Sequence, residues 1–519
     1  MTLAHQRFIL RFCVFNFALL MLVLAWFWRQ NQPISMPEPN LPDGKMQCIS
    51  YSPYYKEGVT PLNINTHISH EQIDQDLTAL SQRFNCVRIY SVSQGLDYVP
   101  EAASKLGMKV YLGAWIGWVK KLTEKEVNLA ISLANKYPDT IKAVIVGNEV
   151  LLRGEQSEAK MKAYIERVKQ AVHVPVTYAD VWEFWRKHPK LEESVDFVTV
   201  HILPYWEDKP QPIESAVDHT QNVMRLLGET FHKPILIGET GWPTTGRQRQ
   251  GALPSSVNQA LYIRSFLQVA QDKHWQYNLI EAFDQPWKRN LEGTVGGYWG
   301  IFDTHFTPKF SLSGSFAERH DGLKLALYAL TGAVLFLMLA FYIKATSKQT
   351  LLASALLGAL LGCFALLQAE YLLAACRTQR EWLSLGGLVL TGWIAIICLP
   401  IYAFTGNKKA KNIMQLALIV FLLAALTANY LLIVDGRYRD FAISLYALPI
   451  IELSLGLLML NQAIRNSASL FKLLSLALVV SASICVYTEP SNHLAWTWLA
   501  INLLLAVANW PKTQTITKN

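Results

Sequence analysis

The chain changes character at residue 323, and this break constrains its fold more than any other feature. Residues 40–322 have the mixed composition of a soluble globular domain, whereas Leu323 begins a series of apolar runs. Runs of this kind cross a bilayer as helices, because helices satisfy their own backbone hydrogen bonds. We therefore predict an all-α multi-span transmembrane domain with seven spans, at roughly 325–343, 350–368, 384–404, 413–434, 441–460, 473–487 and 494–509.

A further apolar run lies near the N-terminus. Residues 12–28 are uncharged and mostly apolar, and Arg11 and Arg29 flank them. A run of 17 residues is just long enough to cross a bilayer. A cleaved signal peptide is the alternative, but this run ends in bulky aromatic residues instead of a small-residue cleavage site. The sequence favours an uncleaved signal anchor, and predicts a division into residues 1–32, 33–322 and 323–519.

Charge in the connections predicts the orientation, because Lys and Arg are retained on the cytoplasmic side. If Arg7 and Arg11 lie inside, so do Lys344, Lys348, Lys408, Lys409, Lys411, Arg465, Lys472, Lys512 and Lys518. The opposite loops also carry basic residues, but acidic ones accompany them, namely Glu370, Glu381, Asp435 and Asp440. We expect both termini in the cytoplasm and residues 30–322 outside it. This topology accounts for the net charge of +8, so nucleic acid is not an expected partner.

Short apolar strands alternate with amphipathic helical runs throughout the globular part. Eight strands alternating with helices predict a (β/α)8 TIM barrel as the catalytic domain. A doubly wound open sheet is the alternative, but no Gly-rich phosphate loop follows the first strand. The expected strands are residues 46–52, 86–92, 109–115, 142–149, 174–181, 196–202, 234–239 and 278–284.

The globular part contains two cysteines, Cys48 and Cys86, on the first and second expected strands. A disulfide is one possibility in an oxidising compartment, and two buried free thiols are the other. The cysteines show neither CxxC nor Cys/His spacing, which predicts no metal site. No nucleotide or flavin motif is present either, and we expect no cofactor.

Two glutamates end buried strands shortly after a glycine, Glu149 in "VIVGNE" and Glu239 in "ILIGE". They belong to the fourth and seventh strands, whose carboxyl ends open into the same cup. Retaining glycoside cleavage needs two carboxyls about 5 Å apart, one as nucleophile and one as acid/base. Asn148 is placed to donate to a sugar 2-hydroxyl. A single glutamate at a strand end is usually solvated or paired with a Lys or Arg. Two such glutamates, surrounded by aromatic residues at the other strand ends, favour catalysis.

The segment "ILIGETGWPTTG" closely resembles the nucleophile signature of glycoside hydrolase family 17, the β-1,3-glucanase family, and "VGNE" resembles its acid/base segment. The resemblance covers about residues 46–305. It implies a retaining mechanism with Glu239 as nucleophile and Glu149 as acid/base. The block "IEAFDQPWKRNLEGTVGGYWGIFD" looks like a bacterial branch in which the barrel is tethered to a multi-span region in the cytoplasmic membrane.

Other residues at the barrel mouth are candidates for substrate binding. His201 is a substrate contact or a structural histidine. Asp284 and Lys288 bind sugar hydroxyls or pair with each other. The aromatic candidates either contact glucose units by stacking or pack the mouth of the barrel. They are Tyr51, Tyr90, Tyr205, Trp242 and Trp287.

Three functions fit this sequence. The barrel hydrolyses β-1,3-glucan, or it transfers the glucosyl intermediate to a sugar and so remodels or branches a glucan, or it is a non-catalytic glycan-binding or export component. Some relatives in the bacterial branch are associated with synthesis of β-1,3/1,6-linked glucans, which favours transfer. Glu452, in the 441–460 run, either lines a glycan path or is a buried structural residue. Asn429 and Asn502 pose the same question. The expected partners are β-glucan, the lipid bilayer, and glucan-synthesis or export proteins.

Overall fold

The computed structural model describes residues 3–459 and 468–510 and divides into two compact units. The barrel unit contains Ile34–Thr245 and Gly251–Phe316, and the helical unit contains Met1–Pro33, Gly246–Gln250 and Ala317–Asn519. Of the basic residues used to predict the orientation, Arg465, Lys512 and Lys518 lie outside the described residues, as does residue 460 of the expected 441–460 span.

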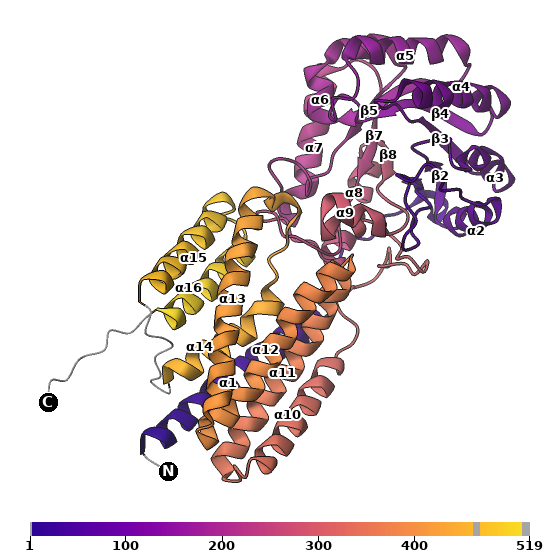
Figure 1. Ribbon diagram of the computed structural model, residues 1–519. Coiled ribbons are helices and arrows are strands. Elements are labelled where there is room, and N and C mark those ends of the chain that lie inside the picture. Colours follow the sequence, from indigo (N-terminus) through magenta and orange to yellow (C-terminus); the bar gives the residue numbers. More distant parts are fainter. Residues whose placement is uncertain (1–2, 460–467, 511–519) are drawn as a thin grey trace. The chain divides into compact units, whose positions relative to one another are not determined.

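Eight parallel strands form a closed barrel in chain order, which confirms the (β/α)8 prediction (Figure 1). Each strand pairs with the next, and the barrel closes where Cys48 and Ile49 of the first strand pair with Asn278 and Leu279 of the last. The strands are β1 (Met46–Ser50), β2 (Phe84–Arg88), β3 (Lys109–Ala114), β4 (Ile141–Asn148), β5 (Val176–Val181), β6 (Val198–His201), β7 (Ile235–Thr240) and β8 (Gln276–Leu279).

Helices follow the strands and cover the outside of the barrel. Ser69, Ser157 and Ser255 each precede a helix and accept a backbone N–H with the side chain, which fixes three helix starts. The barrel helices are α2 (His70–Ser81), α3 (Val99–Lys105), α4 (Lys120–Lys136), α5 (Glu158–Ala171), α6 (Trp182–Lys187), α7 (Ile213–Thr230), α8 (Ser256–Asp272) and α9 (Arg289–Glu292).

Two apolar layers explain why the strand sequences are hydrophobic on both faces. Val87, Leu112 and Val144 belong to the large core that includes the covering helices. The alternate residues form a separate cluster drawn from six strands, which the barrel interior accommodates because strand side chains alternate with period two. This interior cluster contains Cys48, Cys86, Tyr111, Ala143, Ile145, Ala179 and Leu236.

Cys48 and Cys86 are direct partners in the β1–β2 register and form a disulfide. The alternative of two buried free thiols is therefore wrong. Ser50 and Arg88 are the next inward-facing pair along the same two strands and are also in register. The disulfide therefore lies one side-chain layer below Ser50 and Arg88.

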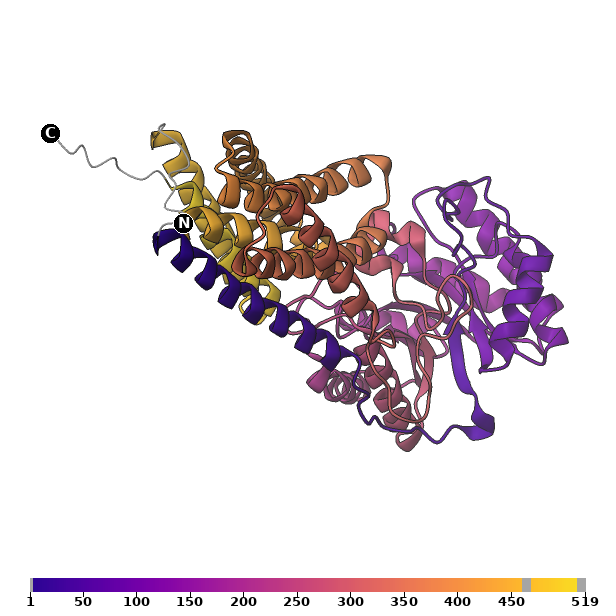
Figure 2. The same cartoon turned by 90° about the horizontal axis from the view of Figure 1, so that it is seen from below.

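The helical unit contains one N-terminal helix and seven C-terminal helices within the described residues. Figure 2 shows α1 lying along the C-terminal helices, and the contacts of α1 with α11 agree. The helices are α1 (Leu3–Gln30), α10 (Lys324–Tyr342), α11 (Lys348–Ala375), α12 (Gln379–Thr405), α13 (Lys408–Val434), α14 (Ile443–Met459), α15 (Ala468–Thr488) and α16 (His493–Asn509).

Six of these helices are long and apolar enough to cross a membrane: α1, α10, α11, α12, α13 and α15. The expected spans at 441–460 and 494–509 correspond to shorter apolar helices, at Ile443–Leu457 and His493–Asn509. A helix of 17 residues is only about 26 Å long, somewhat less than a bilayer core of about 30 Å. Residues 3–459 and 468–510 thus contain eight apolar helices, and six of them meet the length expected of a span.

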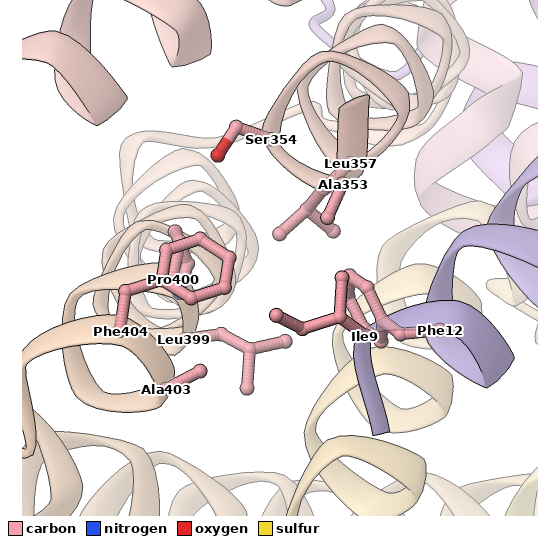
Figure 3. A pocket seen from close by; sticks show the side chains of 9 residues that line it. All are labelled: Ile9, Phe12, Ala353, Ser354, Leu357, Leu399, Pro400, Ala403 and Phe404. Carbon is pink, nitrogen blue, oxygen red and sulfur yellow. The ribbon is translucent and has the colours of Figure 1, made fainter. Parts of the chain in front are cut away.

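Buried polar side chains join the helices of this unit. Asn16 of α1 donates to Glu452 of α14 at 3.5 Å, and both side chains are buried. Asn429 of α13 donates to Asn502 of α16 at 3.2 Å. A small pocket between α1, α11 and α12 is lined almost wholly by apolar side chains, including Ile9 (Figure 3). These contacts agree with the structural alternative for Glu452.

Candidate active site

Glu239 enters the barrel interior because a glycine lets two strands approach closely. A Cβ atom on Gly238 would lie 2.5 Å from Cγ2 of Thr199 on β6, so only glycine fits there. The strand continues into Glu239, whose side chain is 5% exposed. The apolar run of β7 therefore delivers a carboxylate into a nearly enclosed position at the mouth.

Glu149 reaches the same place through a backbone turn at the end of β4. The register with β5 shifts between Ile145 and Asn148, and Gly147 has a positive φ of 85°. Glu149 itself has φ 53°, in the left-handed region that non-glycine residues seldom adopt. Such a conformation costs about 1–3 kcal/mol and persists where the surroundings require it, often at functional sites.

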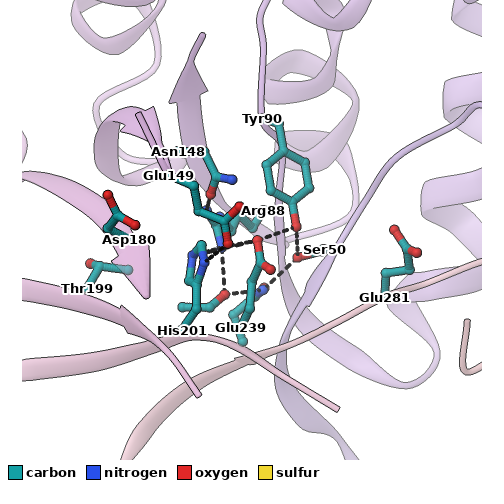
Figure 4. Close-up of polar contacts among 12 residues, drawn as sticks. Ser50, Arg88, Tyr90, Asn148, Glu149, Asp180, Thr199, His201, Glu239 and Glu281 are labelled. Carbon is teal, nitrogen blue, oxygen red and sulfur yellow. Dashed lines mark hydrogen bonds and ion pairs between the residues drawn. The ribbon is translucent and has the colours of Figure 1, made fainter. Parts of the chain in front are cut away.

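The two glutamates and His201 converge (Figure 4). Taking one oxygen or ring nitrogen from each, the three side chains lie within 4.8 Å of one another. His201 Nδ1 is 2.9 Å from Glu149 Oε1, and His201 Nε2 is 3.6 Å from Glu239 Oε1. Carboxyls this close match retaining glycosidases, at about 5–5.5 Å, and not inverting ones, at about 6.5–9.5 Å.

Arg88 and Tyr90 hold the carboxylate of Glu239. Arg88 Nη1 donates to Glu239 Oε1 at 3.2 Å and to the Gly238 carbonyl at 2.7 Å, while Nη2 donates to Asn148 Oδ1. The Tyr90 hydroxyl donates to the same Glu239 oxygen at 2.8 Å. Two charge-assisted donors fix the rotamer of Glu239.

Burial and neighbouring charges act in opposite directions on the carboxyls of the site. Burial by itself would raise the pKa of Glu149, but the hydrogen bond and charge of His201, with the charges of Arg153 and Arg88, leave that pKa lowered. Burial raises the pKa of Glu281 to about 7, although Lys288 pairs with it. Positive neighbours thus outweigh burial at Glu149, whereas burial outweighs the charge of Lys288 at Glu281.

Asn148, Tyr90 and His201, all predicted from sequence, lie at this carboxylate pair. One alternative was that Lys288 and Asp284 pair with each other. In the structure they do not. Lys288 Nζ donates to Glu281 at 2.8 and 2.9 Å. Asp284 pairs with Lys309 at 2.5 Å. Glu281 and Lys309 are the nearer partners because residues 301–309 fold back against residues 281–284, where the Ile301 N–H donates to the Glu281 carbonyl.

Three predicted sugar-contacting aromatic residues are fully buried: Tyr51, Tyr205 and Trp242. The Tyr51 hydroxyl donates to Asp76 of α2 at 2.7 Å, and Trp242 Nε1 donates to the Leu253 carbonyl at 3.0 Å. The Tyr205 ring packs against the Trp242 ring at 5.8 Å between centroids. In the structure these three side chains therefore pack the barrel mouth, which was the alternative to stacking on sugars. Trp287 is partly buried, and its Nε1 donates to Gln285 at 2.8 Å.

Residues central to the site were given no role from the sequence. Arg88 had a usable signal, because an arginine between apolar residues in "CVRIYSV" needs a buried partner. The Ser50 hydroxyl lies 2.9 Å from the Tyr90 hydroxyl and accepts from Asn278 at 2.8 Å, contacts that only the closed barrel creates. Glu292 lies on the short helix α9, and burial raises its pKa to about 6. No sequence pattern indicates this residue.

A close carboxylate pair at the mouth of a (β/α)8 barrel defines a site of the glycoside hydrolase class. Comparison with known proteins agrees: residues 48–300 match the model of the BtgE/BtgC glycoside hydrolase domain. The barrel of this chain is thus similar to that family over just under half of the chain.

Curated relatives cover about half of this chain. A putative glucan endo-1,3-beta-glucosidase, btgC of Aspergillus niger, is 28% identical over 290 residues, covering 49% of this chain and 41% of the relative. A glucan 1,3-beta-glucosidase of Saccharomyces cerevisiae is 25% identical over 280 residues, covering 49% of this chain and 89% of the relative. The chain thus spans less than half the length of the btgC relative.

Among solved structures, a glycoside hydrolase family 17 beta-1,3-glucanosyltransferase from Rhizomucor miehei is 26% identical, with a TM-score of 0.45. That match covers 51% of this chain and 97% of the solved chain.

Proposed function

We propose that the barrel cleaves β-1,3-glucosidic bonds with retention, through a covalent glucosyl–enzyme intermediate. The observation that carries this proposal is the approach of Glu149 and Glu239 to within 4.8 Å across the mouth. The names of the BtgE/BtgC relatives support glucan as the substrate class.

In the first step Glu239 attacks the anomeric carbon while Glu149 protonates the glycosidic oxygen. Arg88 and Tyr90 both bind Oε1 of Glu239, which leaves Oε2 as the attacking oxygen. The bond from the anomeric carbon to the leaving oxygen breaks as the bond to Oε2 forms. His201, 2.9 Å from Glu149, fixes the orientation of the acid.

In the second step Glu149, now ionised, takes a proton from the incoming hydroxyl. The oxygen of that hydroxyl attacks the anomeric carbon from the Glu149 side and releases Glu239 as a carboxylate. Two inversions restore the β configuration. In our proposal Asn148, held by Arg88, binds the sugar 2-hydroxyl, and Trp287 and Lys288 contact neighbouring sugars.

The helical unit tethers this barrel to a membrane in our proposal. Six helices of sufficient length and apolarity support the tether. The Lys and Arg distribution supports cytoplasmic termini and an extracytoplasmic barrel. The resemblance of the "FDQPWK" block to a bacterial branch supports the bacterial cytoplasmic membrane, with residues 1–32, 33–322 and 323–519 as anchor, barrel and span domain. Proteins that make or export glucan are the expected neighbours there.

The experiment uses the full chain in detergent and β-1,3-gluco-oligosaccharides of one defined length, with products weighed by mass spectrometry. Wild type is expected to give products of altered length, and Glu239→Gln is expected to give none. Unchanged substrate with wild-type enzyme, or equal turnover by Glu239→Gln, would contradict the proposed chemistry and favour a glycan-binding role.

A further inference from the structure

Two exposed tryptophans, Trp115 and Trp118, lie in the loop between β3 and α4. The Trp118 residue is 71% exposed and the Trp115 residue 38%. A tryptophan left largely in water forfeits the burial of a large apolar ring, and exposed apolar surface of this kind often marks a binding site. The loop leaves the carboxyl end of β3, adjacent to the end of β4 that carries Glu149.

Arg153 connects the Trp115 ring to the catalytic acid. The Arg153 guanidinium lies 4.8 Å from the centre of the Trp115 ring. The same guanidinium lies 3.6 Å from a carboxylate oxygen of Glu149. The Trp115 ring is thus one side chain away from the acid/base.

The loop itself is held in place from two sides. Gln156, on the connection after Glu149, donates to the Gly117 carbonyl at 2.7 Å. Gly117 N–H donates to Thr123 Oγ1 at 3.1 Å. These bonds fix the backbone next to Trp118, so the exposed ring is presented from an anchored loop.

We propose that Trp115, Trp118 and Arg153 form a subsite for an acceptor sugar, and that this subsite directs the intermediate toward transfer to a glucan hydroxyl. The proposal rests on the proposed function. Glu149 protonates the leaving group and later deprotonates the acceptor, so both sugars occupy its side of the site. A pyranose ring has apolar faces suited to an indole, and its hydroxyls suit a guanidinium.

The transfer step balances without a further reactant. The acceptor O–H gives its proton to Glu149, its oxygen bonds to the anomeric carbon, and the bond to Glu239 breaks to regenerate the carboxylate. A bound acceptor is held at high effective concentration at the anomeric carbon, so it outcompetes water.

An anionic bilayer is the alternative occupant of this surface, because Lys120 and Lys121 follow Trp118 and carry positive charge. The contacts through Arg153 to Glu149 favour the sugar, since a bilayer has no need of a connection to the catalytic acid.

The test compares wild type with Trp118→Ala and Trp118→Tyr, as full chains in detergent, on β-1,3-gluco-oligosaccharides of one length. Mass spectrometry gives the ratio of elongated to shortened products, and release of an aryl leaving group gives the rate of the first step. Ile64→Ala is the control, because Ile64 is also highly exposed, at 78%, but lies in the β1–α2 connection.

We expect wild type to elongate its substrate, and Trp118→Ala to lower the ratio about fivefold, the effect of losing one aromatic contact. Trp118→Tyr should keep most of the elongation, and Ile64→Ala should leave both the ratio and the rate of aryl release unchanged. Shortened products only, or an unchanged ratio in Trp118→Ala, would overturn the acceptor subsite and leave the proposed function standing. Loss of binding to anionic phospholipid vesicles in Trp118→Ala, with that ratio unchanged, would assign the loop to a membrane surface instead. No cleavage by wild type would overturn both proposals.

Discussion

Nδ1 of His201 lies 2.9 Å from a carboxylate oxygen of Glu149, the proposed acid/base. Burial pushes the pKa of Glu149 upward, and the hydrogen bond and charge of His201 lead the opposing influences that leave it lowered. The acid must carry its proton for the first step, so activity is lost as pH rises through the pKa of Glu149.

Replacing His201 by Gln should therefore raise the pKa of Glu149, because burial then acts with less opposition. The alkaline limb of the kcat/KM profile should therefore move to higher pH. The measurement is the pH dependence of kcat/KM on a β-1,3-gluco-oligosaccharide. His232→Gln is the matched control, since His232 is fully exposed on the surface. A limb that stays in place or moves to lower pH would refute this role for His201.

Arg88→Lys should lower kcat/KM about 100-fold, the size of effect seen when a preorganised donor is lost from a catalytic site. A lysine cannot reproduce the planar fork that reaches the Gly238 carbonyl, Glu239 and Asn148 together. Steady-state kinetics and the thermal midpoint would be measured on the same preparation. Arg225→Lys, an exposed change on α7, should leave both unchanged. Wild-type kinetics in Arg88→Lys would show that Glu239 is positioned by other groups.

Removal of the disulfide, by replacing Cys48 and Cys86 with Ala, should lower both stability and kcat. The loop it closes spans 38 residues, for which about 2–4 kcal/mol of stabilisation is typical. Because Ser50 and Arg88 lie one layer above, kcat should fall about tenfold at temperatures well below unfolding, as expected when a preorganised donor shifts.

Leu77→Ala provides the comparison for this double variant. Leu77 lies on α2 in the outer core, and its truncation should cost about 3 kcal/mol. We expect its kcat to match wild type at the same low temperature. Equal kcat in the disulfide variant and in Leu77→Ala would mean that the disulfide only stabilises the barrel.

Local patterns in the sequence predict the barrel well and its mouth only in part. All eight strands lie where apolar runs place them, with ends shifted by a few residues, as at β8, which ends at Leu279 and not at 284. Glu149 and Glu239 are predictable because each ends such a run. The burial of Tyr51 is not, since it depends on Asp76, 25 residues away on α2. The same holds for Lys288 and Asp284, whose partners are set by the fold after β8.

The most direct test of the central claim is the anomeric configuration of the first product. Proton NMR spectra recorded during early turnover of a β-1,3-gluco-oligosaccharide by the full chain distinguish the two anomers before mutarotation mixes them. Glu149 and Glu239 within 4.8 Å of each other predict the β-anomer first, with the α-anomer appearing only by mutarotation. Initial release of the α-anomer would contradict a covalent intermediate on Glu239.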